Sequence, residues 1–182
     1  MSRRFLRLPA IAVAVTVVGA PCVHAQVPLE TRLKAAVVSK FPQFVEWPPS
    51  VWTNRSSVDV CVLGSDRMTP VLQELVAGEA IDGRALVVRE VDRDEDVDQC
   101  HVLFAGAGAT GTHRTLLRRA ASLPVLTVSD DPKFLDNGGI VRLREVDGRL
   151  RFEVNAAAAQ RVGLRISSQL LQLALSVRSG PA

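Results

Sequence analysis

One stretch, Asp98–Thr112 (DQCHVLFAGAGATGT), constrains the fold of this chain more than any other. Val102–Ala105 is a short apolar run that ends in glycine, which predicts a buried strand followed by a tight turn. The residues Gly106, Gly108 and Gly111 then spell G-x-G-x-x-G before a helical segment. This order of strand, glycine turn and helix is typical of a dinucleotide-binding unit.

Two cysteines favour a different kind of domain. Cys100 stands just ahead of the strand just described, and Cys61 lies in a second apolar segment, VDVCVLG. A cysteine pair on neighbouring strands is typical of exported domains, because disulfides form and persist in oxidising compartments. The N-terminus decides between the two interpretations, since it indicates the compartment.

The first 25 residues have the layout of a secretory signal peptide. Three arginines form a basic region, Pro9–Gly19 is an apolar core, and small residues lead up to Ala25. The apolar core is shorter than the roughly 18 residues that a membrane-spanning helix needs. Pro21 stands where a lipidation signal before Cys22 has a small residue. We therefore expect cleavage after Ala25, export to the periplasm, and one mature domain over residues 26–182.

Cleavage changes the charge and the cysteine count. Removing 25 of the 182 residues leaves 157, a length typical of one domain with a substantial core. Lys+Arg falls from 22 to 19 against 19 Asp+Glu, so the mature chain is neutral and a nucleic-acid partner is not expected. Cys22 leaves with the signal, and the even pair that remains favours a disulfide in an oxidising compartment. Two independent buried thiols are the alternative.

Apolar runs alternate with helical segments along the mature chain, which predicts an α/β domain with a mixed sheet of about six strands and helices on its faces. The dipeptide Asp147-Gly148 between two alternating segments is the strongest hairpin signal. Strands are expected at 58–63, 84–91, 102–105, 124–129, 140–146 and 149–155, and helices at 29–45, 70–77, 112–121 and 156–177.

The first predicted helix, Leu29–Val45, places apolar residues at intervals of three and four. Its expected apolar stripe consists of Leu33, Ala36, Val37, Phe41, Phe44 and Val45. Pro42 cannot donate to the helical ladder, so the helix should be interrupted near Val38–Phe41. Trp47 and Trp52 follow, and such half-polar aromatic residues either anchor interfaces or cover the edge of a core.

The glycine turn has two possible functions. A dinucleotide site is disfavoured because no second mononucleotide-binding half follows and because such cofactors are not freely available outside the inner membrane. A helix N-terminus after a glycine turn can still hold a smaller anion. The candidate pocket therefore contains Gly106, Gly108, Gly111 and Asp130.

No catalytic set, metal motif or cofactor motif is evident in the sequence. His101 and His113 lack the H-x-x-x-H spacing of a metal-binding helix. The acidic run Asp92–Asp98 lacks the order of an EF-hand loop, so we expect a solvated loop there. Ser167 and Ser168 are expected inside the last helix. The sequence predicts no enzyme.

The chain resembles the YfiR family of small periplasmic proteins. The resemblance rests on an ordered set of motifs: LKAA (33–36), FVEWP (44–48), CVLG (61–64), GR (83–84), CHVLF (100–104), LTVSD (126–130), GGI (138–140), RFEVN (151–155) and GLRISSQLL (163–171). It implies a Rossmann-like α/β domain without nucleotide chemistry. It also implies that Cys61 and Cys100 form the family's structural disulfide.

The resemblance further implies a function. Such proteins repress an inner-membrane diguanylate cyclase, YfiN, by binding its periplasmic domain, which lowers cyclic-di-GMP and biofilm formation. Oxidation of the cysteines tunes their stability, and they tend to form homodimers. Phe44, Trp47 and Pro48 are the candidate contact residues here. The alternative is a periplasmic solute- or signal-binding module for a sensor or transport system, which would use the pocket at the glycine turn.

Overall fold

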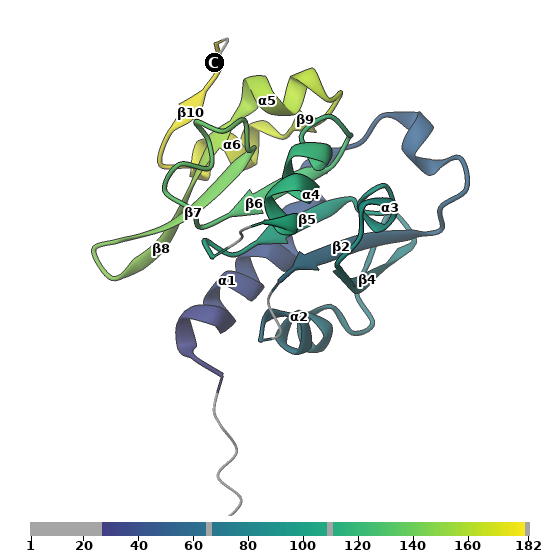
Figure 1. Cartoon of the computed structure of the whole chain (residues 1–182), viewed down its shortest axis with the longest axis horizontal. Coiled ribbons are helices and arrows are strands. Elements are labelled where there is room, and N and C mark those ends of the chain that lie inside the picture. The colour runs from purple at the N-terminus through teal and green to yellow at the C-terminus, as the bar shows by residue number, and fades with distance from the viewer. Residues whose placement is uncertain (1–26, 65–66, 109–110, 181–182) are drawn as a thin grey trace, which may run out of the picture.

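A computed structural model describes residues 27–64, 67–108 and 111–180 of the chain (Figure 1). The expected signal peptide, residues 1–25, lies outside the described residues. Among those described, no helix combines the length and the apolar character that crossing a membrane requires.

A mixed eight-stranded sheet forms the centre of the domain, in the order β10-β8-β7-β6-β5-β2-β4-β3. Its strands are β2 (Ser57–Leu63), β3 (Ala80–Ile81), β4 (Arg84–Val91), β5 (Val102–Ala105), β6 (Leu126–Ser129), β7 (Val141–Val146), β8 (Arg149–Asn155) and β10 (Val177–Arg178). The five strands from β4 to β7 in this order are parallel to one another. The edge strand β3 runs antiparallel to β4, and β8 runs antiparallel to β7 but parallel to β10. The Rossmann-like α/β class is confirmed, and the two strands beyond the expected six are the two-residue edge strands β3 and β10.

Helices cover both faces of this sheet. They are α1 (Leu29–Lys40), α2 (Met68–Val76), α3 (Asp94–Val97), α4 (Thr112–Ala120), α5 (Ala156–Arg161) and α6 (Ser168–Leu173). In Figure 1, α4 crosses in front of β5, whereas α1 passes behind the strands. Val60 and Val62 belong to the apolar cluster of α1 and α2, whereas Cys61 and Leu63 belong to that of α3 and α4. The strand reads as a continuous apolar run because both of its faces are buried.

A second, two-stranded sheet joins segments that are far apart in the sequence. β1 (Val45–Glu46) pairs antiparallel with β9 (Arg165–Ile166), and the Ser167 N–H donates to the Phe44 carbonyl at 2.9 Å. The segment that carries the predicted contact residues is therefore fixed to the segment before α6.

The N-terminal helix differs from its prediction in length and in its buried face. As expected, it stops ahead of Pro42: α1 ends at Lys40, and Phe41–Phe44 forms a 3-10 helix. The expected stripe is wrong for α1, because its buried residues are Ala35, Val38 and Ser39, while Leu33 is 46% exposed. The change from α to 3-10 geometry and then to strand rotates the later aromatic residues away from the face that one continuous helix would present.

The C-terminal region is not the single long helix that was predicted over 156–177. α5 ends after Arg161, and Gly163 has a left-handed φ of +78°. The Leu164 N–H returns to the Ala159 carbonyl at 3.0 Å, which closes the helix end. Ser167, predicted inside the helix, instead caps α6 by accepting the Leu170 N–H. The glycine that follows α5 and the serine that caps α6 therefore determine the helix ends, although the apolar spacing continues past both.

Two local turn predictions had different outcomes. The hairpin between β7 and β8 is confirmed, and Asp147 (φ 51°) and Gly148 (φ 69°) take the positive φ angles that a tight two-residue turn requires. The acidic run 92–98 was predicted to be a solvated loop, which is wrong, because it contains the short helix α3 and a fully buried Val97. The buried side chain of Val97 holds the acidic segment against the sheet.

Candidate functional site

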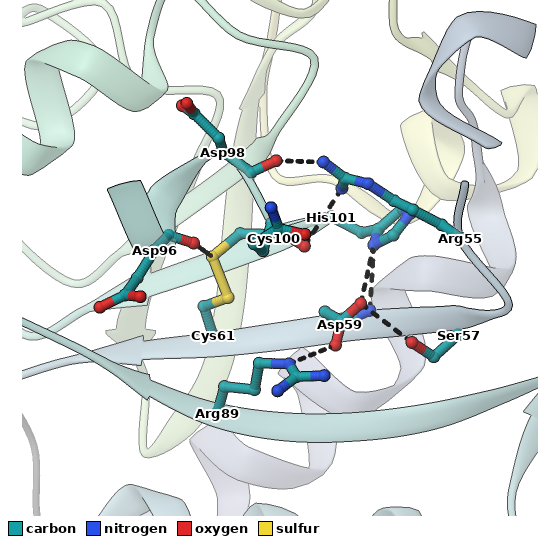
Figure 2. A network of polar contacts seen from close by, with 10 residues as sticks. Arg55, Ser57, Asp59, Cys61, Arg89, Asp96, Asp98, Cys100 and His101 are labelled. Carbon is teal, nitrogen blue, oxygen red and sulfur yellow. Dashed lines mark hydrogen bonds and ion pairs between the residues drawn. A yellow bond between two sulfur atoms is a disulfide. The ribbon is translucent and has the colours of Figure 1, made fainter. Parts of the chain in front are cut away.

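A disulfide joins Cys61 on β2 to Cys100, just before β5, with a Cα–Cα distance of 5.7 Å. The expected bond is confirmed. Both residues are buried between the sheet and α3, and the Asp96 carbonyl lies 3.5 Å from the Cys100 Sγ. The disulfide therefore ties two adjacent central strands together (Figure 2).

His101 directly follows the disulfide and is completely buried. Its Nδ1 accepts the backbone N–H of Asp59 at 3.0 Å. An Nδ1 that accepts a hydrogen bond carries no proton, so the neutral imidazole carries its proton on Nε2. The Nε2 atom is buried and has no hydrogen-bond partner in the described part of the chain.

A polar network surrounds this histidine, and Figure 2 shows its members converging from β2, β4 and the segment before β5. The Asp59 carboxylate, only 7% exposed, accepts from Arg89 Nε at 2.6 Å and from Ser57 Oγ at 3.1 Å. The Arg55 guanidinium donates to the backbone carbonyls of Asp98 and Gln99. These bonds hold the start of β2 against the residues that precede the disulfide.

The environment of His101 favours the neutral imidazole. Burial is the main cause that lowers its pKa from 6.5 to about 4, the positive charges of Arg55 and Arg84 act in the same direction, and Asp59 acts in the opposite direction. The histidine is therefore uncharged at neutral pH, in agreement with the hydrogen bond that its Nδ1 accepts.

Both tryptophans of the chain pack on the His101 ring. Trp52 stacks on it with ring centroids 4.7 Å apart, and Trp47 meets it edge to face at 5.6 Å. The two indoles contact each other at 6.1 Å, and the Arg84 guanidinium lies 4.3 Å from the centre of the Trp52 ring. We call Trp47, Trp52 and His101 the aromatic cluster.

The predicted contact residues Phe44, Trp47 and Pro48 lie together at the start of this cluster. All three are half-buried, and Phe44 and Trp47 also pack against the main core. The indole Nε1 of Trp47 is buried without a hydrogen-bond partner among the described residues. Trp47 in this half-buried segment contacts the His101 ring, and His101 directly follows the disulfide residue Cys100.

The predicted pocket residues do not line one cavity. Asp130 forms an ion pair with Lys34 of α1 and accepts the Ala107 N–H at 2.5 Å. Burial opposes the charge of Lys34, but the hydrogen bonds and negative charges of Asp130 and Glu30 raise its pKa above 10.5. Gly111 has a φ of +54° and precedes α4. The Asp130 carboxylate therefore holds α1 and the glycine turn together.

Two cavities lie on opposite sides of β6. Asp130 lines one of about 720 Å³, which lies between α1 and the β7–β8 hairpin. Gly106 lines another of about 530 Å³, which lies between α4 and residues 131–139. Successive residues of a strand face opposite sides, which explains why Ser129 and Asp130 belong to different cavities. Gly108 is exposed and lines neither.

The roles of Asp59 and Arg55 and the central position of His101 were not predicted from the sequence. One signal was present, since Asp59 is a lone carboxylate inside the apolar run VDVCVL. A charged residue at such a position requires partners when both faces of the strand are buried. In the described residues, no group of three or more His, Cys, Asp or Glu side chains is arranged to hold a metal ion.

The fold is similar to that of at least one protein of known structure. A conserved domain protein from Vibrio cholerae O1 biovar El Tor is similar in structure, with 17% sequence identity and a TM-score of 0.43. The match covers 70% of this chain and 56% of that protein, so this chain spans little more than half of its length. No curated protein matches the sequence.

A family model also matches most of the chain. The model of the family described as YfiR/HmsC-like matches residues 31–175, from α1 to the residues before β10. This range includes the disulfide, the aromatic cluster and the cavity between α4 and residues 131–139. The chain therefore belongs to the YfiR/HmsC-like family.

Proposed function

We propose that this chain is a periplasmic repressor that binds the periplasmic domain of a YfiN-type, inner-membrane diguanylate cyclase. The YfiR/HmsC-like family is a family of periplasmic regulatory proteins, and the family match over residues 31–175 is the observation that carries the proposal. Export would use residues 1–25 as a cleaved signal peptide. The mature domain would begin at residue 26 and act as a homodimer without catalysis.

Repression would act through a change in population. A protein that binds the inactive conformation of the cyclase more tightly than the active one shifts the equilibrium toward the inactive state. Release of the repressor would free the enzyme, raise cyclic-di-GMP and promote biofilm.

Phe44, Trp47 and Pro48 would supply part of the contact surface. All three side chains are half-buried, Trp47 packs on Trp52 and His101, and strand β1, which lies between Phe44 and Trp47, pairs with β9. A rigid aromatic surface binds at a low cost in conformational entropy, which suits a regulatory interface. Because His101 follows Cys100, loss of the disulfide would disturb the support of this surface.

The first experiment measures cellular cyclic-di-GMP in a deletion strain with and without the plasmid-borne protein. A rise on deletion that the intact exported protein reverses supports the proposal. An unchanged level under several growth conditions contradicts it and favours the solute- or signal-binding alternative.

A second experiment tests the contact surface. The variants Phe44→Ala and Trp47→Ala should lose repression while retaining a cooperative melting transition. Leu173→Ala, a change at an exposed apolar residue of α6, is the control and should repress normally. Normal repression by Phe44→Ala and Trp47→Ala, equal to that of the control, would show that the contact lies elsewhere.

A further inference from the structure

The cavity between α4 and residues 131–139 has features of a ligand site that the proposed repressor function does not use. It has a volume of about 530 Å³ and lies at the carboxyl ends of β5 and β6, where open α/β sheets commonly bind ligands. Gly106 directly follows β5 and Ser129 ends β6, and both residues line the cavity.

The floor of the cavity is polar where the neighbouring sheet is apolar. In the parallel register, Thr127 stands beside Leu103, and Ser129 stands beside Ala105. Leu103 and Ala105 belong to the apolar cluster under α4, whereas Thr127 and Ser129 place buried hydroxyls on the same face, each only 1% exposed. Burial of polar groups costs free energy that an apolar residue would avoid, so packing alone does not account for them.

Both hydroxyls have a proton to donate into the cavity. Thr127 Oγ1 accepts the Ile140 N–H at 3.1 Å, and Ser129 Oγ accepts the Asp131 N–H at 3.1 Å. Each oxygen is therefore occupied as an acceptor of a backbone proton. Neither hydroxyl proton has an acceptor among the residues that the structure describes, so both remain available to a ligand.

The walls of the cavity carry an excess of positive charge. Arg114 and Arg118 project from successive turns of α4, and Lys133 lies on the opposite wall. None of the three side chains has a carboxylate partner in the described part of the chain, and Arg118 donates only to Thr115 Oγ1, at 3.1 Å. Asp131 is the one acidic lining residue, and its Oδ1 accepts the Lys133 backbone N–H at 2.8 Å.

We propose that this cavity binds a small solute that carries two or more negative charges on phosphate or carboxylate groups. Guanidinium groups bind both kinds of oxyanion through paired N–H donors, and hydroxyl donors at the floor complete such a site. The predicted glycine turn contributes Gly106 to this site, whereas Asp130 lies in the other cavity. The site is independent of the cyclase-binding surface.

Isothermal titration calorimetry of the mature chain with citrate and with pyrophosphate tests the proposal. Ionic strength is held constant, and acetate serves as the monovalent control. At least one of the two polyvalent anions should bind saturably, and the preferred one identifies the carboxylate or the phosphate source. Failure of both to bind would overturn the proposal.

Two variants locate the binding. Arg114→Gln/Arg118→Gln should raise the dissociation constant by about tenfold or more, because each lost charge-assisted contact weakens binding. The matched control Arg32→Gln/Arg161→Gln removes the same charge from exposed positions of α1 and α5, outside the cavity, and should bind as the wild type does. Equal affinities in the two double variants would show unspecific attraction and overturn the site.

Ser129→Ala tests the floor without changing the net charge. This variant should keep the wild-type melting temperature within a few degrees and weaken binding by about threefold or more, as expected for one lost hydrogen bond to a charged ligand. Unchanged affinity in a folded Ser129→Ala variant would contradict the proposed geometry.

Discussion

At the scale of single residues, His101 is the residue with the most unusual environment. It accepts a backbone proton from β2, touches both indoles and follows a disulfide cysteine. Arg55, Asp59 and Arg84 are the charged groups that act on it. Protonation would break the bond from Asp59 N–H and add a buried positive charge next to two arginines.

This environment predicts that the free energy of unfolding decreases as the pH is lowered through a defined range. The unfolded chain binds a proton at His101 below pH 6.5, whereas the folded chain does so only near its lowered pKa of about 4. Stability from His101 is therefore complete above pH 6.5 and is lost between pH 6.5 and about 4. Lowering the pH from 7.5 to 5 should cost about 2 kcal/mol, measured by urea unfolding.

The control for this prediction is the other described histidine. His113→Gln should retain the pH dependence, because it leaves His101 and its partners in place, whereas His101→Gln should remove most of it. A wild-type protein whose unfolding free energy is flat between pH 7.5 and 5 would show that His101 is not held neutral.

Lys34 gives a second prediction at this scale. Its side chain is 15% exposed, and its ammonium group pairs with Glu30 and with Asp130, whose side chain is 19% exposed. Lys34→Met should lower the unfolding free energy by about 2 kcal/mol, because it leaves a partly buried carboxylate without its cation. Since the pKa of Lys34 is raised, this contribution persists up to pH 10.5 and is lost at higher pH.

Lys40→Met is the matched control in the same helix. Lys40 pairs with Glu79 at 3.8 Å, and both side chains are more than half exposed, so the loss should stay below about 0.5 kcal/mol. Equal losses in the two variants would mean that the Lys34 pair behaves like an ordinary surface pair.

At the scale of elements, prediction from sequence succeeded where a local signal determines the backbone. Apolar runs located the longer strands, and Asp147-Gly148 located the hairpin, because few residues tolerate its φ angles. It failed for the last helix, since the apolar spacing across 156–177 continues through Gly163 even though the backbone turns there. Apolar periodicity indicates which residues are buried. One glycine with a left-handed φ changes the direction of the chain without interrupting the apolar spacing in the sequence.

The same glycine yields a stability prediction. A Cβ at position 163 would meet Pro48 only at an ordinary distance of 3.7 Å, so the cost of Gly163→Ala comes from its φ of +78°. This conformation should cost about 1 kcal/mol. Gly180→Ala, at an open position without a positive φ, should be neutral in the same thermal-melting assay. Equal melting temperatures for the wild type and Gly163→Ala would refute this account of the helix end.

The candidate sites were predicted less completely than the fold. The cysteine pair was found because its chemistry needs only two residues on adjacent strands. The glycine turn marks the end of a strand but says nothing about which face each neighbour takes, so the sequence grouped Gly106 with Asp130 although they line different cavities. Arg114, Arg118 and Lys133 were missed as a group, since only the packing of α4 against residues 131–139 brings them together.

At the scale of the whole molecule, the motifs that carry the family resemblance come together in space. FVEWP and GLRIS pair as β1 and β9, and CVLG, CHVLF and LTVSD lie on the adjacent strands β2, β5 and β6. The disulfide crosses the first two of these strands. Five of the nine motifs that carry the resemblance therefore lie on paired strands although they are far apart in the sequence.

This arrangement predicts a large effect of the disulfide on global stability. The bond closes a loop with a sequence separation of 39 residues. Its reduction should lower the unfolding free energy by roughly 4 kcal/mol, mainly by freeing the unfolded chain. Urea unfolding with and without a reductant measures the difference.

Cys61→Ala/Cys100→Ala provides the comparison, because alanine leaves no buried thiol or hydroxyl behind. This variant should match the reduced wild type and should not respond to the reductant. A wild-type midpoint that the reductant does not move would mean that the bond contributes little to the fold.

The aromatic cluster has one more consequence, which concerns light emission. The chain has two tryptophans and no tyrosine, and both tryptophans contact His101 beside the disulfide. The ultraviolet emission of the protein therefore arises from this one place in the molecule. An unlabelled sample reports in its own spectrum when the imidazole gains a proton or the sulfur bridge opens, and a partner seated on Trp47 would change the same signal.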